Sequence, residues 1–364
     1  MDLSVTQLKF KRGFIMSKHS FEWAIIGAGP AGIASIGQLI NNGVKPQEIL
    51  WIDPKFRVGD FGELWSNVSS NTRVKLFNDF LSHCKSFKYD EKEKIFELEN
   101  LPIAETCKLG YMVEPLAFVT QQLRQQVNCI ESSVEKLRLY DKKWNMTLHD
   151  GQICSSKNVI LATGAVPRSM PETEGVETIH MYDALDIDKL AKKVNKDDTV
   201  AVFGSSHSAV ILLRDLLDLG VKEVINFYRE PLRFAVQLDD WILFDNTGLK
   251  GNTAVWAREY LNGKMPNRLK RMISNDENVA QNLPICSKVI YAIGFNPRSP
   301  IIEDYPNYKY NPYNGIIAPG LFGVGIGFPE SKTDRYGNTE LSVGLWKFMV
   351  YLDRAVPLWL KYGV

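Results

Sequence analysis

The sequence has few cysteines, and their spacing does not predict a redox or metal site. Five occur in 364 residues, an odd number, and no two of them form a C-x-x-C pair. This pattern indicates neither a disulfide framework nor a zinc knuckle. We therefore predict no metal site and expect the cysteines to be small buried hydrophobic residues.

Long apolar runs and an excess of charge are also missing. The longest apolar stretches, around Ile25 and from Val343 to Leu352, are too short or too interrupted by Lys and Asp to span a bilayer, and no signal-peptide pattern opens the chain. The 43 Lys and Arg residues nearly balance the 42 Asp and Glu residues, and no basic stretch is interleaved with aromatics. We expect a cytoplasmic protein with no transmembrane segment and no nucleic-acid partner.

The chain is long enough for two domains, since 45% of its residues are hydrophobic and can fill a sizeable core. Its beginning carries no periodic pattern, and Met16 could be the first residue as well as Met1. We expect residues 1–20 to form a disordered N-terminal extension.

The first motif is "WAIIGAGPAGIASIGQLI", an apolar strand followed by Gly27-x-Gly29-x-x-Gly32 and an apolar helix that ends near Gly43. This order is typical of a dinucleotide-binding unit: the first glycine allows a tight turn, the second lets the backbone approach a pyrophosphate, and the third lets helix and strand pack closely. A second strand, "EILWID", ends at Asp53. A carboxylate there can accept a ribose hydroxyl and would repel a 2′-phosphate, which favours FAD or NAD over NADP.

The segment "DTVAVFGSSHSAVILLRDLLDLGVKEVINFYRE" repeats this architecture. Gly204 supplies the turn, Ser206 stands at the close-approach position, and Ala209 replaces the packing glycine. The Ser206 hydroxyl could cap amides or donate to a phosphate oxygen. His207 could place a donor near the phosphates, or it could simply be exposed.

The second strand of this copy ends in Tyr228-Arg229 rather than in an acid, and Arg233 follows four residues on. Guanidinium groups suit a 2′-phosphate, which favours NADPH. Alternatively, Arg229 pairs with Glu230 or Glu223 at the surface, and NADH is then the alternative cofactor.

Two similar strands bracket the second unit: "NVILATGAVPRSMP", with Gly164, and "SKVIYAIGFNPRSP". They predict an α/β fold of two Rossmann-like, three-layer dinucleotide-binding domains, in which the second domain (165–285) is inserted into the first (21–164 and 286–364). A final helix over "ELSVGLWKFMVYL" should return its N-terminus to the first site, where it can stabilise negative charge.

Together these pieces resemble the flavoproteins with two dinucleotide-binding domains, which include thioredoxin reductases and flavin-containing monooxygenases. The resemblance implies an enzyme with FAD in the first site and NAD(P)H in the second. The implied FAD-binding residues are Gly27, Gly29, Pro30, Ala31, Gly32, Asp53, Trp65, Gly164 and Gly325. The implied NADPH-binding residues are Gly204, Ser205, Ser206, His207, Ala209 and Arg229.

Details within this superfamily favour the monooxygenases. The inserted domain has no C-x-x-C, and "WSNVSSNTRVKLFNDF" resembles the monooxygenase segment in which an asparagine lies over the flavin. Asn71 matches that asparagine and is the candidate catalytic residue, with a turn or helix cap as its alternative role. One departure is "EGVETIHMYDAL", where Gly175 and His180 are one residue too far apart for the monooxygenase pattern.

The function we predict is hydride transfer from NADPH to FAD, followed by oxygen activation as a monooxygenase on a small organic substrate. One alternative is an NADPH-dependent electron-transfer reductase without a redox disulfide, with ferredoxin or a quinone as acceptor. A second is a non-catalytic flavin-binding regulatory protein. The sequence leaves a homodimer open.

Overall fold

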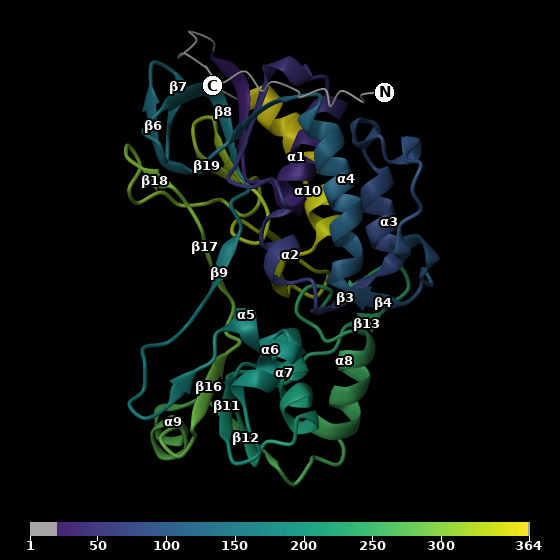
Figure 1. Ribbon diagram of the computed structural model, residues 1–364, viewed down its shortest axis with the longest axis vertical. Coiled ribbons are helices and arrows are strands. Elements are labelled where there is room, and N and C mark those ends of the chain that lie inside the picture. Colours follow the sequence, from purple (N-terminus) through teal and green to yellow (C-terminus); the bar gives the residue numbers. More distant parts are fainter. Residues whose placement is uncertain (1–19, 363–364) are drawn as a thin grey trace, which may run out of the picture.

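The computed structural model describes residues 20–362, and they form two α/β units joined by two crossing segments (Figure 1). Of the extension expected over residues 1–20, only Ser20 lies in this range, so that expectation concerns residues outside the described part. No helix within residues 20–362 is long and apolar enough to cross a membrane.

The larger unit is built on a mixed sheet with parallel central strands. β1 (Phe21–Ile26) lies between β2 (Ile49–Asp53) and β8 (Ile153–Leu161) and is parallel to both. Residues 23–26, 49–52 and 159–161 of these strands are continuous apolar runs because both of their faces are covered. In spatial order the sheet runs β18 (Ile301–Ile302), β6 (Val134–Tyr140), β7 (Lys143–Leu148), β8, β1, β2 and β5 (Asn128–Glu131), with β20 (Leu321–Gly323) beside β8 and β19 (Ile316–Ala318) beside β20.

Helices cover one face of the central strands, and the β6–β7 hairpin packs against the other. The first core contains side chains of α1 (Pro30–Asn41), α3 (Val74–Ser82), α4 (Val113–Arg124) and α10 (Leu345–Tyr362) (Figure 1). The second core joins Trp144 and Met146 of β7 to Ile26 of β1. These layers match the expected three-layer arrangement.

The smaller unit has a parallel sheet in the order β10 (Glu177–Thr178), β16 (Lys288–Tyr291), β11 (Thr199–Phe203), β12 (Glu223–Tyr228) and β15 (Leu269–Ile273). Its helices are α5 (Met181–Ala184), α6 (Ile187–Lys193), α7 (His207–Asp218), α8 (Gly251–Trp256) and α9 (Asp276–Asn282). Separate apolar clusters lie on its two faces. The predicted α/β class with two Rossmann-like units is therefore confirmed.

The two crossing segments pair with each other. β9 (Ala165–Pro167) leads out of the larger unit and runs antiparallel to β17 (Phe295–Pro297), which leads back. The return was expected at residue 286, but β16 still belongs to the smaller sheet, where it pairs with β10 and β11. The expectation differed because β16 and β8 end in similar apolar runs, and the sequence does not show which sheet each strand joins.

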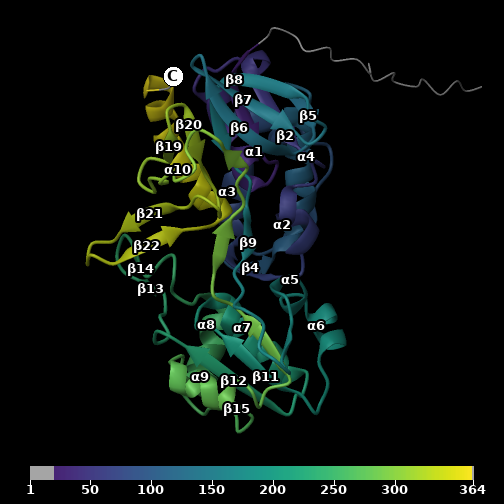
Figure 2. The same ribbon diagram turned by 90° about the vertical axis from the view of Figure 1, so that its left-hand side faces the viewer.

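Short elements complete the fold. The final helix begins at Leu345 rather than at Glu340, because residues 339–342 alternate in burial and pair as a strand. The remaining elements are α2 (Gly59–Leu64), the pair β3 (Ser69–Arg73) and β4 (Thr106–Lys108), the hairpin β13 (Val236–Gln237) and β14 (Ile242–Leu243), and the hairpin β21 (Glu330–Thr333) and β22 (Thr339–Ser342). Figure 2 shows the two hairpins near each other on one side of the molecule.

Candidate functional site

A cavity of about 870 Å³ opens at the carboxyl ends of β1 and β2. In open α/β sheets, ligands bind at this edge. Most of the lining comes from the larger unit, but Leu185, His207, Ser208 and Asn246 of the smaller unit also contribute. One cavity is thus shared by both units.

The first glycine loop has the geometry that its sequence predicts. Gly27 has φ +111°, and a side chain on it would overlap the carbonyl oxygen of Ala162. A side chain on Gly32 would overlap the carbonyl oxygen of Gly27. Gly29 is different, since a Cβ there would lie 3.9 Å from its nearest contact, the Val58 carbonyl oxygen, while the residue lines the cavity. No protein contact requires a glycine at Gly29, so its small size serves the cavity.

The N-terminus of α1 is free to receive an anion. The helix has Gly29 at its N-cap and Pro30 at its first position, with no side-chain cap and no acidic residue in its first turn. Helix N-termini of this kind present unpaired amides and a positive dipole end. Both Pro30 and Ala31 line the cavity.

Asp53 holds the glycine loop in place. Its carboxylate is 7% exposed and accepts hydrogen bonds from the backbone amides of Ala28 (2.7 Å), Lys55 (2.9 Å) and Phe56 (2.7 Å). A carboxylate accepts about four hydrogen bonds. Most of the acceptor positions of Asp53 are therefore occupied by backbone amides of the protein and not left for a ribose hydroxyl. Asp53 nevertheless lines the cavity.

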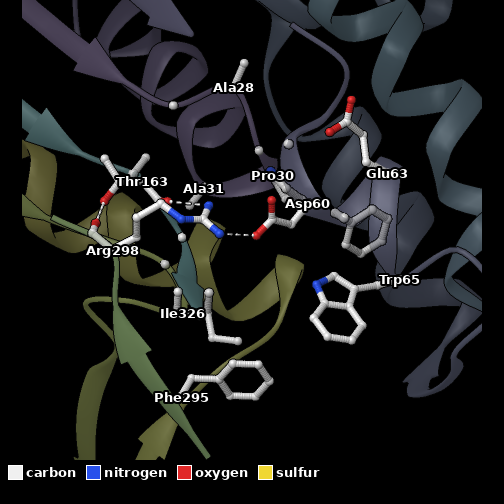
Figure 3. Close-up of a pocket in the computed structure, with 18 of the residues that line it drawn as sticks. Ala28, Pro30, Ala31, Asp60, Glu63, Trp65, Thr163, Phe295, Arg298 and Ile326 are labelled. Carbon is white, nitrogen blue, oxygen red and sulfur yellow. Dashed lines mark hydrogen bonds and ion pairs between the residues drawn. The ribbon is translucent and has the colours of Figure 1, made fainter. Parts of the chain in front are cut away.

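Aromatic and apolar side chains line the part of the cavity that faces the smaller unit. Trp65 packs against Tyr182 and Phe295, with ring centroids 5.1 and 6.3 Å apart. Figure 3 shows Trp65, Phe295 and Ile326 directed towards the same space. Leu345 and Phe348, at the start of α10, add to this lining, so the final helix returns its N-terminus to the cavity.

Asn71 lies in β3 and lines the same cavity. The N-cap of the following helix, α3, is Arg73, so Asn71 is not a helix cap in this structure. Gly164 and Gly325, on neighbouring loops, also line the cavity.

The second glycine loop repeats the backbone geometry of the first. Gly204 has φ +128°, and a side chain on it would overlap the carbonyl oxygen of Ala292. Ser206 is the N-cap of α7 but makes no side-chain cap bond, and Ala209 is fully buried. The helix has no acidic residue in its first turn. Its N-terminus is thus open to an anion in the same way as that of α1.

His207 connects the two units. Its Nε2 lies 3.1 Å from the carbonyl oxygen of Ser69 in β3, which makes Nε2 the protonated nitrogen. Burial lowers the pKa of the imidazole, and Nδ1 is buried without a partner. Two roles were considered for His207, a donor near the NADPH phosphates or an exposed side chain; in the structure the ring is half-buried, and the neutral imidazole gives its one N–H to the larger unit.

Arg229 is exposed at the end of β12 and does not line the shared cavity. Within residues 20–362 it forms no ion pair, because Glu230 pairs with Arg233 at 2.6 Å and Glu223 pairs with Lys270 at 2.8 Å. The surface pairing considered as its alternative role is therefore not formed.

Sequence reasoning missed an ion pair across the cavity. Nη2 of Arg298, on the returning segment, lies 2.8 Å from Asp60 Oδ2 in α2 (Figure 3). The Arg298 backbone amide donates to the carbonyl of Gly164. The hydroxyl of Thr163 donates to the carbonyl of Arg298. The repeated Pro-Arg-Ser sequence pointed to this segment but not to its partners.

The cysteines are not placed for redox chemistry. No cysteine lines the cavity in the part of the chain that the structure describes. Burial raises the pKa of Cys84 and Cys154 to about 12 and that of Cys129 and Cys286 to about 11, and it also raises the pKa of Cys107. These thiols are protonated at neutral pH, so they are poor nucleophiles.

Comparison with known proteins agrees with this geometry. Residues 21–318 match the family model described as pyridine nucleotide-disulphide oxidoreductase. The monooxygenase AgnR1 of Paecilomyces divaricatus is 30% identical over 383 residues, covering 92% of this chain and 97% of the relative.

Solved structures show the same fold. A flavin-containing monooxygenase from Stenotrophomonas maltophilia matches with a TM-score of 0.65 and 15% identity, over 94% of this chain and 99% of that one. The ornithine N-hydroxylase of Kutzneria sp. 744 matches with a TM-score of 0.62 and 13% identity, over the same shares. The family match spans both glycine loops and both crossing segments, so the chain belongs to the pyridine nucleotide-disulphide oxidoreductase family and is an FAD-dependent oxidoreductase.

Proposed function

We propose that this protein is an NADPH-dependent FAD enzyme of the monooxygenase type, which acts on a small organic substrate. The observation that carries the proposal is the shared cavity, in which the first glycine loop and the first turn of α7 line one space. Similarity to the monooxygenase AgnR1 over nearly the whole chain supports the oxygenase class.

The residues around the first loop fit FAD. Gly29 leaves room beside the uncapped N-terminus of α1, so the amides of Ala31 and Gly32 would bind the pyrophosphate. Asp53 would hold the loop and retain one acceptor position for a ribose hydroxyl. When bound, FAD would supply hydride acceptance and electron delivery to oxygen.

NADPH would bind to the smaller unit. Gly204, Ser205 and Ser206 form a loop before the uncapped N-terminus of α7, and Ala209 allows the close packing that this loop needs. His207 would hold α7 against β3 through its bond to Ser69, which keeps the two cofactor sites adjacent.

Three features of the chain would protect reduced FAD. Trp65, Phe295 and Phe348 would exclude water from the apolar part of the cavity. The N-terminus of α10 would favour negative charge nearby. The Asn71 side-chain amide lines the same cavity and would supply a hydrogen-bond donor beside FAD, which would favour oxygen transfer to the substrate over release of hydrogen peroxide.

Absorbance spectroscopy of the purified protein tests the proposal. We expect a flavin spectrum that NADPH bleaches without oxygen, and an oxygen-dependent transient that differs from the oxidised and reduced spectra. Bleaching followed by immediate reoxidation, with faster electron transfer to a quinone or ferredoxin, would favour the reductase. A flavin spectrum that NADPH does not change would favour the regulatory protein, and the absence of flavin would overturn all three.

The variant Asn71→Leu separates a role in oxygen chemistry from a structural one. We expect Asn71→Leu to reduce FAD at the normal rate but to release more hydrogen peroxide per NADPH consumed. Equal slowing of both half-reactions would contradict the role proposed for Asn71.

A further inference from the structure

The two nucleotide units align residue by residue at the strand next to each glycine loop. In the larger unit, Nε1 of Trp51 donates to the carbonyl of Gly27 at 2.9 Å. In the smaller unit, Nδ2 of Asn226 donates to the carbonyl of Gly204 at 2.8 Å. Asn226 therefore occupies the place of Trp51, and Tyr228, two residues later, occupies the place of Asp53.

The neighbouring strands extend this alignment. β5 lies beside β2 and pairs Cys129 with Trp51, whereas β15 lies beside β12 and pairs Arg271 with Asn226. Where the larger unit has a small thiol beside Trp51, the smaller unit thus has a guanidinium beside Asn226, whose side chain bonds the glycine loop.

Arg271 is held by uncharged groups only. Its Nε donates to Oδ1 of Asn226 at 2.9 Å, and its guanidinium lies 4.7 Å from the centre of the Tyr228 ring. The side chain is half-buried, and burial lowers its pKa. Among the described residues, no carboxylate lies within ion-pair distance of Arg271, whereas the adjacent Lys270 pairs with Glu223.

A half-buried guanidinium without a counter-ion loses part of its hydration, and an anionic ligand can compensate this loss. The Asn226 bond fixes the Nε side of the fork, so the Nη groups remain to bind a planar or tetrahedral anion. The Tyr228 ring supports the guanidinium from one side.

We infer that Arg271, whose guanidinium lies over the ring of Tyr228, is the residue that selects NADPH over NADH, because it binds the 2′-phosphate. This inference rests on the proposed function. It shifts the main selective role away from Arg229, whose exposed charge is screened by solvent and contributes less. An acid at the position of Tyr228, such as Asp53 in the larger unit, would repel the same phosphate.

The test is isothermal titration of the oxidised holoenzyme with NADP⁺ and NAD⁺, which bind without turnover. We expect Arg271→Gln to weaken NADP⁺ binding about 10- to 100-fold, because it removes charge-assisted hydrogen bonds, and to change NAD⁺ binding by less than about twofold. Competition by 2′,5′-ADP should fall in parallel, whereas competition by 5′-AMP should not.

Three variants serve as comparisons. Lys270→Gln removes the same charge from the adjacent residue and should leave both affinities within about twofold of the wild type. Arg229→Ala should weaken NADP⁺ binding less than Arg271→Gln does. Arg271→Lys keeps the charge but loses the fork and should give an intermediate NADP⁺ affinity, which keeps the test valid if Arg271→Gln fails to fold.

The outcomes separate this inference from the proposed function. Equal losses for NADP⁺ and NAD⁺ in Arg271→Gln, an unchanged NADP⁺ affinity, or a larger loss in Arg229→Ala would overturn the role of Arg271 while the oxidoreductase function stands. A wild-type protein that binds neither nucleotide would overturn the proposed function itself, and the inference would fall with it.

Discussion

Replacing Gly204 by alanine should disable the second nucleotide site and leave the first intact. The residue has φ +128°, and its new Cβ would overlap the backbone carbonyl oxygen of Ala292. That carbonyl follows β16, whose pairing with β11 prevents it from moving freely. The substitution therefore combines backbone strain with a steric clash.

The expected cost follows from these two terms. The left-handed region costs an L-residue about 1–2 kcal/mol. Overpacking against a fixed backbone costs about 1–3 kcal/mol more. The total loss of folding free energy, about 2–5 kcal/mol, should affect the smaller unit alone, since Gly204 and Ala292 both lie in loops of that unit.

Two matched variants isolate the terms. Gly220→Ala has φ +79° and no heavy atom within 4 Å, so it should cost only the backbone strain. Gly27→Ala repeats the full cost in the larger unit, where a Cβ would overlap the carbonyl of Ala162. Gly204→Ala should purify with normal flavin content but lose reduction by NADPH, and Gly27→Ala should lose flavin.

The measurements are flavin absorbance per protein, NADP⁺ titration, and urea unfolding followed by far-ultraviolet circular dichroism. We expect the free energy of unfolding to decrease in the order wild type, Gly220→Ala, Gly204→Ala. If Gly204→Ala unfolded within about 0.5 kcal/mol of the wild type and bound NADP⁺ normally, the steric account of this loop would be refuted.

Three further changes test contacts between distant parts of the chain. Arg298→Met removes an ion pair of a partly exposed side chain, so it should weaken FAD binding, measured by ultrafiltration, by no more than about fivefold; a larger loss would mean that Arg298 contacts FAD directly. In the wild type, the urea midpoint should fall as pH drops below 6.5, because burial lowers the pKa of His207 in the folded state and its protonation then favours the unfolded state. His207→Gln should make this fall less steep, and an unchanged slope would contradict this. Lys347→Met should speed proteolysis of residues 236–250, since Lys347 Nζ bonds the Asp245 carbonyl at 2.9 Å and Asn246 Oδ1 at 2.6 Å; Lys332→Met, on β21, is the control.

Local pattern was sufficient to predict both glycine loops. Gly27 and Gly204 each follow a buried strand and precede a helix, so their backbone conformation depends on neighbours in sequence. The same local reasoning misplaced the return to the larger unit, because β16 and β8 end in similar apolar runs but pair with strands of different sheets.

The contacts that assemble the cavity had no local signal. His207 and Ser69 are 138 residues apart, and Arg298 and Asp60 are 238 apart. Each pair joins groups that have many alternative partners in an unfolded chain. Which partners meet depends on how the crossing segments position the two units relative to each other. For the same reason, the sequence pointed to Arg229 and not to Arg271. The role proposed for Arg271 depends on the neighbouring strand with which it pairs, not on its own position in the sequence.

The contact between the units is polar at several points, which bears on how ligands enter. Asp245 forms an ion pair with Lys347 of α10, and Glu340 accepts hydrogen bonds from the backbone amides of Asn246 and Thr247. Interfaces of this kind within a chain resemble transient protein contacts, and their charged groups are readily solvated when they part. Trp65 and Val68 are apolar side chains of the larger unit that pack against the core of the smaller one, with Trp65 on Tyr182. We therefore expect the units to separate at lower cost than a hydrophobic interface would allow. The cavity could then admit a nicotinamide or a substrate without exposing either core.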